Sequence, residues 1–242
     1  MTDLSVVIPV HNEESNIQPL IDEVRRALDG KIDFELIYVN DGSSDGTLNR
    51  LRKARENCPQ LRIISHVESV GQSSAVRTGI EQAVAPWIAT LDGDGQNDPA
   101  DIPALYETLL SQYAAGVQLV NGYRKKRRDT FIKRISSKLA NGIRSYLLKD
   151  QTPDTGCGLK LFSREAYLAL PFFDHMHRFM PAMIQRGGGK VVSVEVHHRE
   201  RERGSSHYGF FDRLWVGIFD LLGVAWLQRR VTHPVVDKEE SG

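Results

Sequence analysis

The sequence contains few cysteines, no excess of charge of either sign and no uninterrupted apolar run of membrane-spanning length. Its two cysteines, Cys58 and Cys157, lie far apart and match no metal-ligand spacing, which argues against a disulfide framework and favours a reducing compartment. The 31 basic and 31 acidic residues balance, so global charge identifies no class of partner. The longest apolar tract, Phe210–Leu227, contains three charged residues and falls short of the ~20 apolar residues that a membrane span needs.

No signal-peptide pattern precedes the strand-like run Leu4–Val10, so a cytoplasmic location is expected. The 242 residues are enough for one large α/β domain with a small appendage. We expect a catalytic domain over residues 1–204, an amphipathic interfacial segment over 205–232 and a polar tail over 233–242.

Apolar runs of strand length alternate with helical patterns in the first half of the chain. The strand-like runs are Leu4–Val10, Phe34–Val39, Leu61–Ser65 and Trp87–Leu91, and the helical patterns are Glu14–Leu28, Gly46–Glu56 and Ser73–Val84. Such alternation is typical of right-handed βαβ units around a mostly parallel sheet flanked by helices. The sequence therefore predicts an α/β fold that binds its ligand beyond the carboxyl ends of the strands.

Polar clusters follow three of these strands: residues 11–13, residues 40–45 and Asp92-Gly93-Asp94. On an extended segment, the side chains of residues i and i+2 point to the same face. The carboxylates of Asp92 and Asp94 are therefore expected to converge just past a strand end. Hard cations such as Mg²⁺ prefer oxygen ligands, usually one or two carboxylates plus the phosphates of a nucleotide. Alone, an Asp-x-Asp is weak support for a metal site, since acidic residues also begin loops and cap helices.

Each cluster also has a purely structural interpretation. Residues 40–45 suit a turn whose Asp and Ser side chains cap the following helix, and Asn12 and Glu13 suit a helix start. Three carboxylate-bearing loops at adjacent strand ends, however, concentrate negative charge that a metal or donor groups must compensate. We therefore interpret the three clusters as one site for a nucleotide and a cation.

The segments Val7–Glu13, Val39–Thr47 and Leu91–Gln96 follow one another in this order. Together they resemble the GT-A domain of family 2 glycosyltransferases. The sequence is most similar to the dolichol-phosphate mannosyltransferase group and its bacterial polyprenyl-phosphate relatives, because that group's downstream motifs are also present. These are Asn121–Arg124, Asp154–Phe162 and Gly204–Tyr208, so the resemblance covers nearly the whole chain.

The resemblance implies a GT-A fold and assigns roles to particular residues. Around the base and ribose of a nucleotide sugar it places Pro9, Asn12, Glu13 and Asp41. It implies that Mg²⁺ or Mn²⁺, bridging the diphosphate, is held by Asp92, Asp94 and Gln96. It implies that phosphates are faced by Arg124, Arg128 and Arg134. It also implies that the site is closed by Arg203 and Ser206. The catalytic set is then Asp92, Asp94, Gln96 and Arg124.

One position departs from the family's pattern. The closing motif usually carries lysine where this chain has His207, and an unperturbed imidazole is mostly uncharged at neutral pH. Phosphate binding by this side chain is therefore in doubt. Arg199, Arg201 and Arg203 are the candidates to supply the missing charge.

The activity implied by the resemblance is inverting transfer of a hexose from a nucleotide-diphosphate sugar, of the GDP-mannose or UDP-glucose type, to a polyprenyl phosphate at the cytoplasmic face of a membrane. A metal and arginines would stabilise the charge that develops on the leaving diphosphate. A phosphate monoester acceptor is already anionic near neutral pH. It needs no strong general base, so positioning would supply most of the catalysis.

Two segments of the second half suit a peripheral membrane platform. A basic amphipathic helix is predicted over residues 131–147, and the apolar tract Phe210–Leu227 ends near Trp226, Arg229 and Arg230. The alternative for the basic helix is an ordinary solvated face over a core contact. Docking on a separate membrane protein and assembly into a homo-oligomer also remain open.

Other functional classes fit less well. A family 2 glycosyltransferase with a soluble glycan or protein acceptor is the main alternative, and a non-catalytic nucleotide-sugar-binding subunit is another. A haloacid dehalogenase-type phosphatase usually carries its Asp-x-Asp near the N-terminus, which this chain does not. The dinucleotide and P-loop glycine patterns are missing, and the basic run Arg124–Arg128 lies in no nucleic-acid recognition module.

Overall fold

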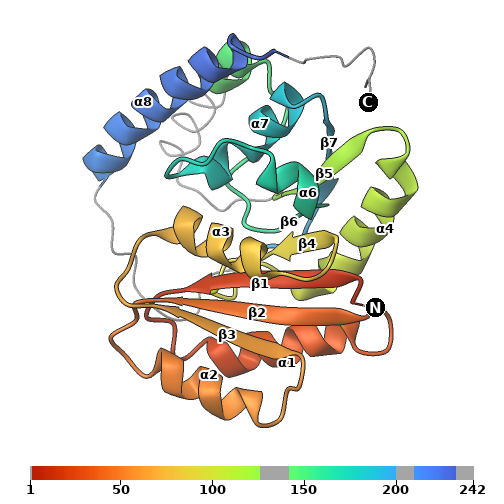
Figure 1. Ribbon diagram of the computed structural model, residues 1–242, viewed down its shortest axis with the longest axis vertical. Coiled ribbons are helices and arrows are strands. Elements are labelled where there is room, and N and C mark those ends of the chain that lie inside the picture. Colours follow the sequence, from red (N-terminus) through yellow and green to blue (C-terminus); the bar gives the residue numbers. More distant parts are fainter. Residues whose placement is uncertain (1, 126–141, 200–209, 233–242) are drawn as a thin grey trace, which may run out of the picture.

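The computed structural model describes residues 2–125, 142–199 and 210–232. Its centre is a seven-stranded sheet in the order β3-β2-β1-β4-β6-β5-β7 (Figure 1). The strands are β1 (Leu4–Val10), β2 (Phe34–Asp41), β3 (Leu61–His66), β4 (Trp87–Thr90), β5 (Val117–Tyr123), β6 (Lys160–Ser163) and β7 (Lys190–Glu195). Only β6 runs antiparallel to its neighbours, β4 and β5. The predicted mostly parallel α/β sheet is confirmed.

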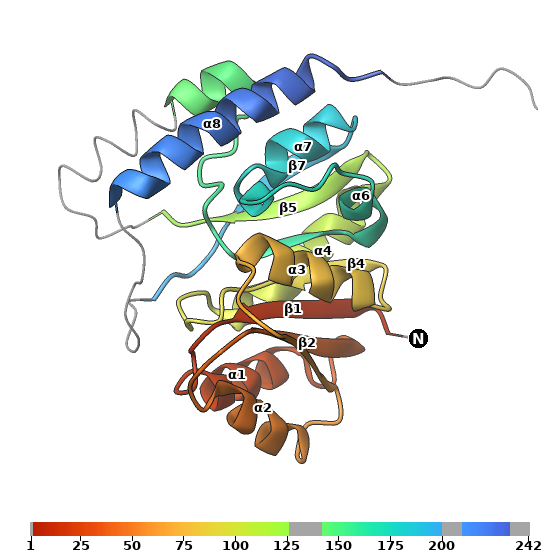
Figure 2. The same ribbon diagram turned by 60° about the vertical axis from the view of Figure 1, so that its left-hand side comes forward.

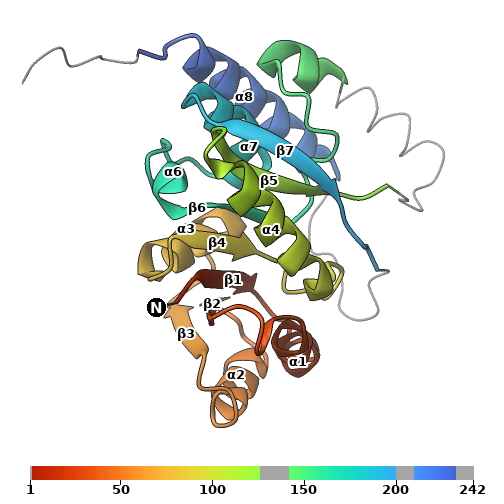
Figure 3. The same cartoon turned by 90° about the vertical axis from the view of Figure 1, so that its right-hand side faces the viewer.

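Helices cover both faces of the sheet (Figure 3). The α-helices are α1 (Ile17–Leu28), α2 (Thr47–Arg55), α3 (Gln72–Gln82), α4 (Ile102–Tyr113), α6 (Arg164–Leu168), α7 (Met180–Arg186) and α8 (Phe210–Gln228), and η1 (Pro99–Asp101) and η2 (Met176–Arg178) are 3₁₀ helices. Val6 and Ile8 of β1 pack with α1, α2 and α4, whereas Val7 packs with α3 and α7. Because successive strand residues point to opposite faces, a strand covered on both sides reads as a continuous apolar run.

A glycine in α3 controls how closely that helix approaches the sheet. A Cβ atom at Gly79 would lie 2.5 Å from Cγ1 of Val7, so a larger residue could not occupy this position without moving α3 away from β1. The close packing fixes the first turn of α3, with Gln72 and Ser73, beside the carboxyl ends of the parallel strands.

The C-terminal helix α8 packs across the top of the fold (Figure 2). Val224 is buried in the core that α7 also lines, and Gln228 Nε2 donates to the carbonyl of Leu148 over 3.0 Å. Residues 142–148 are helical, as predicted, and the rest of the expected basic helix lies outside the described residues. No helix in the described ranges is both long and apolar enough to cross a membrane. The expected boundaries at residues 204 and 232 stay predictions.

Candidate active site

The structure brings the three predicted polar clusters to one edge of the sheet. β1 lies between β2 and β4 and is parallel to both, so the loops that follow these strands are neighbours. Val10 is in register with Asn40, and Val7 with Thr90. The shared edge predicted from the strand pattern is therefore present, and the Asp-x-Asp lies at it.

Asp92 lies in a strongly charged environment. Its Oδ1 accepts a hydrogen bond from Gln72 Nε2 over 2.8 Å. Burial and the neighbouring Asp94 carboxylate raise the pKa of Asp92, while the charges of Lys160 and Arg124 act in the opposite direction. Burial and repulsion by Asp94 together outweigh these cations and the hydrogen bond from Gln72, so the pKa of Asp92 stays raised.

A divalent cation fits this pair of carboxylates. Asp92 and Asp94 offer hard oxygen ligands, and a cation would offset both the burial of the Asp92 carboxylate and its repulsion by Asp94, which together raise the pKa of Asp92. Within the described ranges no group of three or more His, Cys, Asp or Glu side chains could hold a metal ion. A cation at Asp92 and Asp94 would thus need further ligands from phosphates or water, as is usual for Mg²⁺.

Gln96, the third predicted metal ligand, is tied to the segment after β7. Its backbone N–H donates to Asp94 Oδ1 over 3.1 Å, which holds the turn after the Asp-x-Asp. Its side-chain Nε2 donates to the carbonyl of Arg199 over 3.3 Å, and Arg199 N–H donates to the Gln96 carbonyl over 2.9 Å. Among the contacts of the described residues, the side-chain oxygen of Gln96 is left for a cation.

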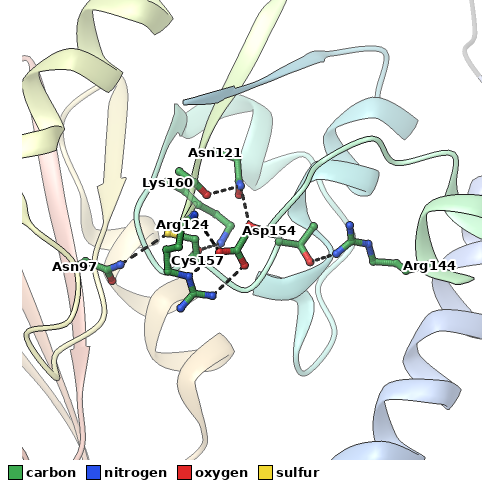
Figure 4. Close-up of polar contacts among 9 residues, drawn as sticks. Asn97, Asn121, Arg124, Arg144, Asp154, Cys157 and Lys160 are labelled. Carbon is green, nitrogen blue, oxygen red and sulfur yellow. Dashed lines mark hydrogen bonds and ion pairs between the residues drawn. The ribbon is translucent and has the colours of Figure 1, made fainter. Parts of the chain in front are cut away.

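Arg124 directly follows β5 and forms a bidentate ion pair with Asp154 (Figure 4). Its Nε and Nη2 donate to the two carboxylate oxygens of Asp154 over 2.6 and 2.9 Å. Burial lowers the pKa of Arg124, but hydrogen bonding to Asp154 outweighs this, so the pKa is raised and the guanidinium stays charged. Asn121 holds the same loop by donating to the Asp154 carbonyl over 2.9 Å. The pair fixes the position of the Arg124 guanidinium, whose charge acts on Asp92.

Asn12 and Glu13 join the loop after β1 to the loop after β2. Asn12 adopts a left-handed conformation with φ 56°, and its Oδ1 accepts from the backbone N–H of Ser44 over 2.8 Å. The backbone N–H of Glu13 donates to the Thr47 hydroxyl over 2.9 Å, and its carboxylate accepts from Asn16 over 2.6 Å. Both residues therefore shape the edge of the site through contacts with their own loops.

Asp41 is a buried carboxylate that organises the loop between β3 and α3. It accepts hydrogen bonds from His66 Nδ1 (2.7 Å), the Ser69 hydroxyl (2.8 Å) and the backbone N–H groups of Val70 and Gly71 (both 3.0 Å). Burial acts to raise the pKa of Asp41, but these donors outweigh it and the pKa is lowered. Its carboxylate is thus occupied within the protein.

Asp41→Asn is expected to lower the free energy of unfolding by about 1–3 kcal/mol at pH 7. A carboxylate whose pKa is lowered by folding contributes stability above its unfolded-state pKa and loses that contribution as the pH falls through its folded-state pKa. The difference in the free energy of unfolding between wild type and Asp41→Asn, measured by urea unfolding, should therefore become smaller below about pH 4. The exposed Asp22→Asn in α1 is the control, and a gap that does not change with pH would contradict this role.

Three residues at the site were not predicted from the sequence: Gln72, Lys160 and His177. Together with Pro9 and Asp92 they line one small pocket. Lys160 is buried, donates from Nζ to the Cys157 carbonyl, and has its pKa lowered by burial. A lysine in a strand-like run gives no sign of burial in the sequence, and neither does a histidine in a helical region.

The remaining predicted residues are placed as follows. Arg128, Arg134, Arg201, Arg203, Ser206 and His207 lie outside the described residues. Arg199 is described, and its guanidinium contacts Glu23 over 2.8 Å and Asp98 over 2.7 Å. In this arrangement its charge is directed toward the α1 side of the fold.

Comparison with known proteins identifies the family. The sequence model of Glycosyl transferase family 2 matches residues 5–170, more than half of the chain. The chain belongs to this family. The resemblance inferred from the three strand-end motifs is therefore confirmed for this family 2 glycosyltransferase.

Curated relatives of this family 2 glycosyltransferase act on polyprenyl phosphates by name. A dodecaprenyl-phosphate galacturonate synthase from Rhizobium johnstonii is 36% identical over 238 residues, covering 96% of this chain and 69% of the relative. An undecaprenyl-phosphate 4-deoxy-4-formamido-L-arabinose transferase from Pectobacterium carotovorum is 35% identical over 225 residues, covering 91% of this chain and 66% of the relative. This chain thus spans about two thirds of the length of these relatives.

Solved structures confirm the GT-A fold. Glucosyl-3-phosphoglycerate synthase from Mycobacterium tuberculosis, in complex with Mg²⁺ and UDP, has a TM-score of 0.70 at 20% identity, covering 96% of this chain and 81% of that one. A mannosyltransferase from Pyrobaculum calidifontis, in complex with GDP-Man and Mn²⁺, has a TM-score of 0.67 at 19% identity. The match covers 96% of this chain and 65% of that one. At these identities the likeness concerns the fold alone.

Proposed function

We propose that this glycosyltransferase transfers a sugar, with inversion, from a nucleotide-diphosphate sugar to a polyprenyl phosphate, using Mg²⁺ or Mn²⁺. The observation that carries the proposal is the pair of carboxylates, Asp92 and Asp94, at the carboxyl edge of the sheet, with the cations Arg124 and Lys160 near Asp92. Such a site suits a cation that bridges the protein and a diphosphate.

On the donor side, Asp92 and Asp94 would hold the metal, and Gln72 orients Asp92 through its hydrogen bond of 2.8 Å. When bound, the cation supplies charge stabilisation for the departing diphosphate. Arg124, held charged by Asp154, adds a fixed positive charge to the same region. The adjoining part of the site, where the nucleoside is proposed to bind, is formed or shaped by Pro9, Asn12, Glu13 and Asp41. Contacts of these residues with the base stay predictions.

On the acceptor side, the names of the curated relatives support a polyprenyl phosphate. The acceptor phosphate is its own nucleophile, because it is anionic near neutral pH. The protein therefore has to bring its oxygen in line behind the sugar carbon and screen the charge. Arg128, Arg134, Arg203 and Ser206 are proposed to bind this phosphate. The relatives' names include different sugars, and a GDP-mannose or UDP-glucose type donor stays a prediction.

A peripheral membrane contact through α8 is part of the proposal. Phe219 and Trp226 leave 70% and 58% of their surface exposed on α8, and Tyr146, on the neighbouring helical stretch 142–148, leaves 85% exposed. Arg229 and Arg230 follow at the end of α8, and the Arg230 guanidinium lies 5.8 Å from the Trp226 ring centre. Exposed aromatic side chains next to arginines suit the interface of an anionic membrane, on the inner face in a cell.

The double substitution Phe219→Glu with Leu222→Glu is expected to abolish co-sedimentation with vesicles of anionic lipid. It places two negative charges on an exposed apolar face that would otherwise enter the lipid interface. Leu110→Glu, on the exposed side of α4, is the matched control and should sediment like wild type. Undiminished sedimentation of the double variant would exclude α8 as the membrane contact and favour docking through another surface.

A thermal-shift series tests the donor class. UDP, GDP and their sugars, each with and without Mn²⁺, should include one nucleotide that raises the melting temperature only when the metal is present. A nucleotide sugar that binds without ever being turned over in the presence of polyprenyl phosphate would favour the non-catalytic subunit. Transfer to a water-soluble glycan would favour the soluble-acceptor alternative.

A further inference from the structure

A small pocket lies beside Asp92, between the first turn of α3, the start of β6 and the 3₁₀ helix η2. Its polar lining includes Gln72, Asp92, Lys160 and His177. The cavity volume is about 20 Å³. That is room for about one water-sized group. A whole sugar ring does not fit, but one of its hydroxyl groups does.

The imidazole of His177 is held in position by Ser73. The backbone N–H of His177 donates to the Ser73 hydroxyl oxygen over 3.5 Å, and this oxygen lies 2.7 Å from Nδ1 of the same histidine. A serine hydroxyl can donate to a ring nitrogen or accept from it, so the direction of this hydrogen bond depends on the tautomer of His177. In the tautomer in which Nδ1 accepts, the ring proton is on Nε2 and is available to a ligand.

The turn that carries His177 is anchored on both sides. His175, which precedes η2, adopts a left-handed conformation with φ 61°, and its ring Nδ1 lies 3.2 Å from the Asp220 carboxylate of α8. Its backbone N–H donates to the Asp174 carboxylate over 2.8 Å. Met176, next to His177, is fully buried. The position of the imidazole is therefore set by the fold before any ligand arrives.

His177 is a neutral hydrogen-bond donor. Burial, with the positive charges of Lys160 and Arg178, lowers the pKa of His177 to about 3. A neutral N–H gives a hydroxyl oxygen a directional partner. Phosphate groups are instead bound by charged donors such as the arginines and by the cation.

We infer that the pocket seats a single hydroxyl group of the transferred sugar and that Nε2–H of His177 donates to it, which makes His177 a specificity-determining residue. The inference rests on the proposed function: because Asp92 lines this pocket, a diphosphate held at Asp92 and Asp94 would bring its attached sugar next to it. A substituent much larger than a hydroxyl would be excluded at this ring position. Lys160, on the pocket wall, provides further polar lining.

Calorimetry in the presence of Mn²⁺ separates the sugar contribution from the nucleotide contribution. UDP and UDP-glucose, and GDP and GDP-mannose, are titrated into wild type and His177→Ala. For the nucleotide that wild type binds, the nucleotide sugar should bind more tightly than the nucleoside diphosphate. His177→Ala should weaken the sugar form by about tenfold and leave the nucleoside diphosphate unchanged. His177→Gln, which keeps an N–H donor at a similar reach, should recover part of the loss.

Deoxy analogues identify the hydroxyl. In wild type, one deoxy form of the sugar should lose about the same tenfold in affinity, and His177→Ala should bind this analogue and the parent sugar equally. Ser73→Ala, which removes the hydrogen bond that holds the imidazole in position, should show a partial loss of sugar affinity. Ser74→Ala, one position along α3, is the matched control and should bind like wild type.

Three results would overturn the inference. They are equal weakening of nucleoside diphosphate and nucleotide sugar in His177→Ala, unchanged affinity for both, and a wild type to which the sugar contributes no affinity. Circular dichroism and melting temperature show whether each variant is folded. Binding is measured without any acceptor lipid. A His177-dependent sugar affinity with no transfer to polyprenyl phosphate would therefore contradict the proposed function and leave the inference intact.

Discussion

Asp94→Asn is expected to abolish the Mn²⁺-dependent stabilisation by nucleoside diphosphate and to reduce kcat/KM for sugar transfer by about a thousandfold. Asparagine keeps the size of the side chain but removes the negative charge that a cation needs. The carboxylate of Asp94 also accepts from Gln96 N–H, and the amide oxygen can still do so, which limits damage to the turn. Thermal shift with and without Mn²⁺ reports the binding loss, and initial rates report the catalytic one.

Asp29→Asn is the control for this substitution. Asp29 follows α1 and forms an exposed ion pair with Arg25, far from the carboxyl edge of the sheet. It should respond to metal and nucleotide like wild type. If Asp94→Asn also responds like wild type, the assignment of the metal site to Asp92 and Asp94 is wrong.

Gly158→Ala is expected to reduce kcat/KM by about a hundredfold while changing the melting temperature little. A Cβ atom at Gly158 would lie 2.2 Å from Oδ2 of Asp92, so the carboxylate has to move. The clash involves the end of a side chain rather than the backbone, and the fold can accommodate it. The metal ligand, however, loses its position.

The same substitution at Gly223 of α8 is the control for Gly158→Ala. A Cβ atom there meets nothing within 4 Å, so the change adds a methyl group without displacing a neighbour. Initial rates and Mn²⁺-dependent thermal shift should match wild type. Full activity of Gly158→Ala would mean that the position of Asp92 is not important for the reaction.

The parts of the fold and of the site that could be predicted are those that depend on patterns of neighbouring residues. Alternating apolar runs predicted β1 to β4 and their connecting helices, and the polar residues after those strands predicted the edge at which Asp92 and Asp94 lie. Parallel pairing then brings the loops together without further information. These features depend on the order of residues within about ten positions, which the sequence displays directly.

The parts that could not be predicted depend on contacts between distant segments. Ser73 and His177 are 104 residues apart, and their hydrogen bond holds the imidazole in position. The resemblance implies a place for Asp41 beside the nucleotide, which stays a prediction. In the described structure its oxygens hold residues 66–71, contacts that the motif does not encode. Residue type identified the location of the site, whereas the partners of each side chain came only from the fold.

The central claim is that the protein transfers a sugar from a nucleotide-diphosphate sugar to a polyprenyl phosphate. The direct test is incubation of the purified protein with Mn²⁺, undecaprenyl phosphate in detergent and a radiolabelled nucleotide sugar from the thermal-shift series, followed by extraction into organic solvent. We expect labelled lipid that requires the metal, the acceptor and Asp94. Label that never enters the organic phase, with a nucleotide sugar that binds the protein, would contradict the claim.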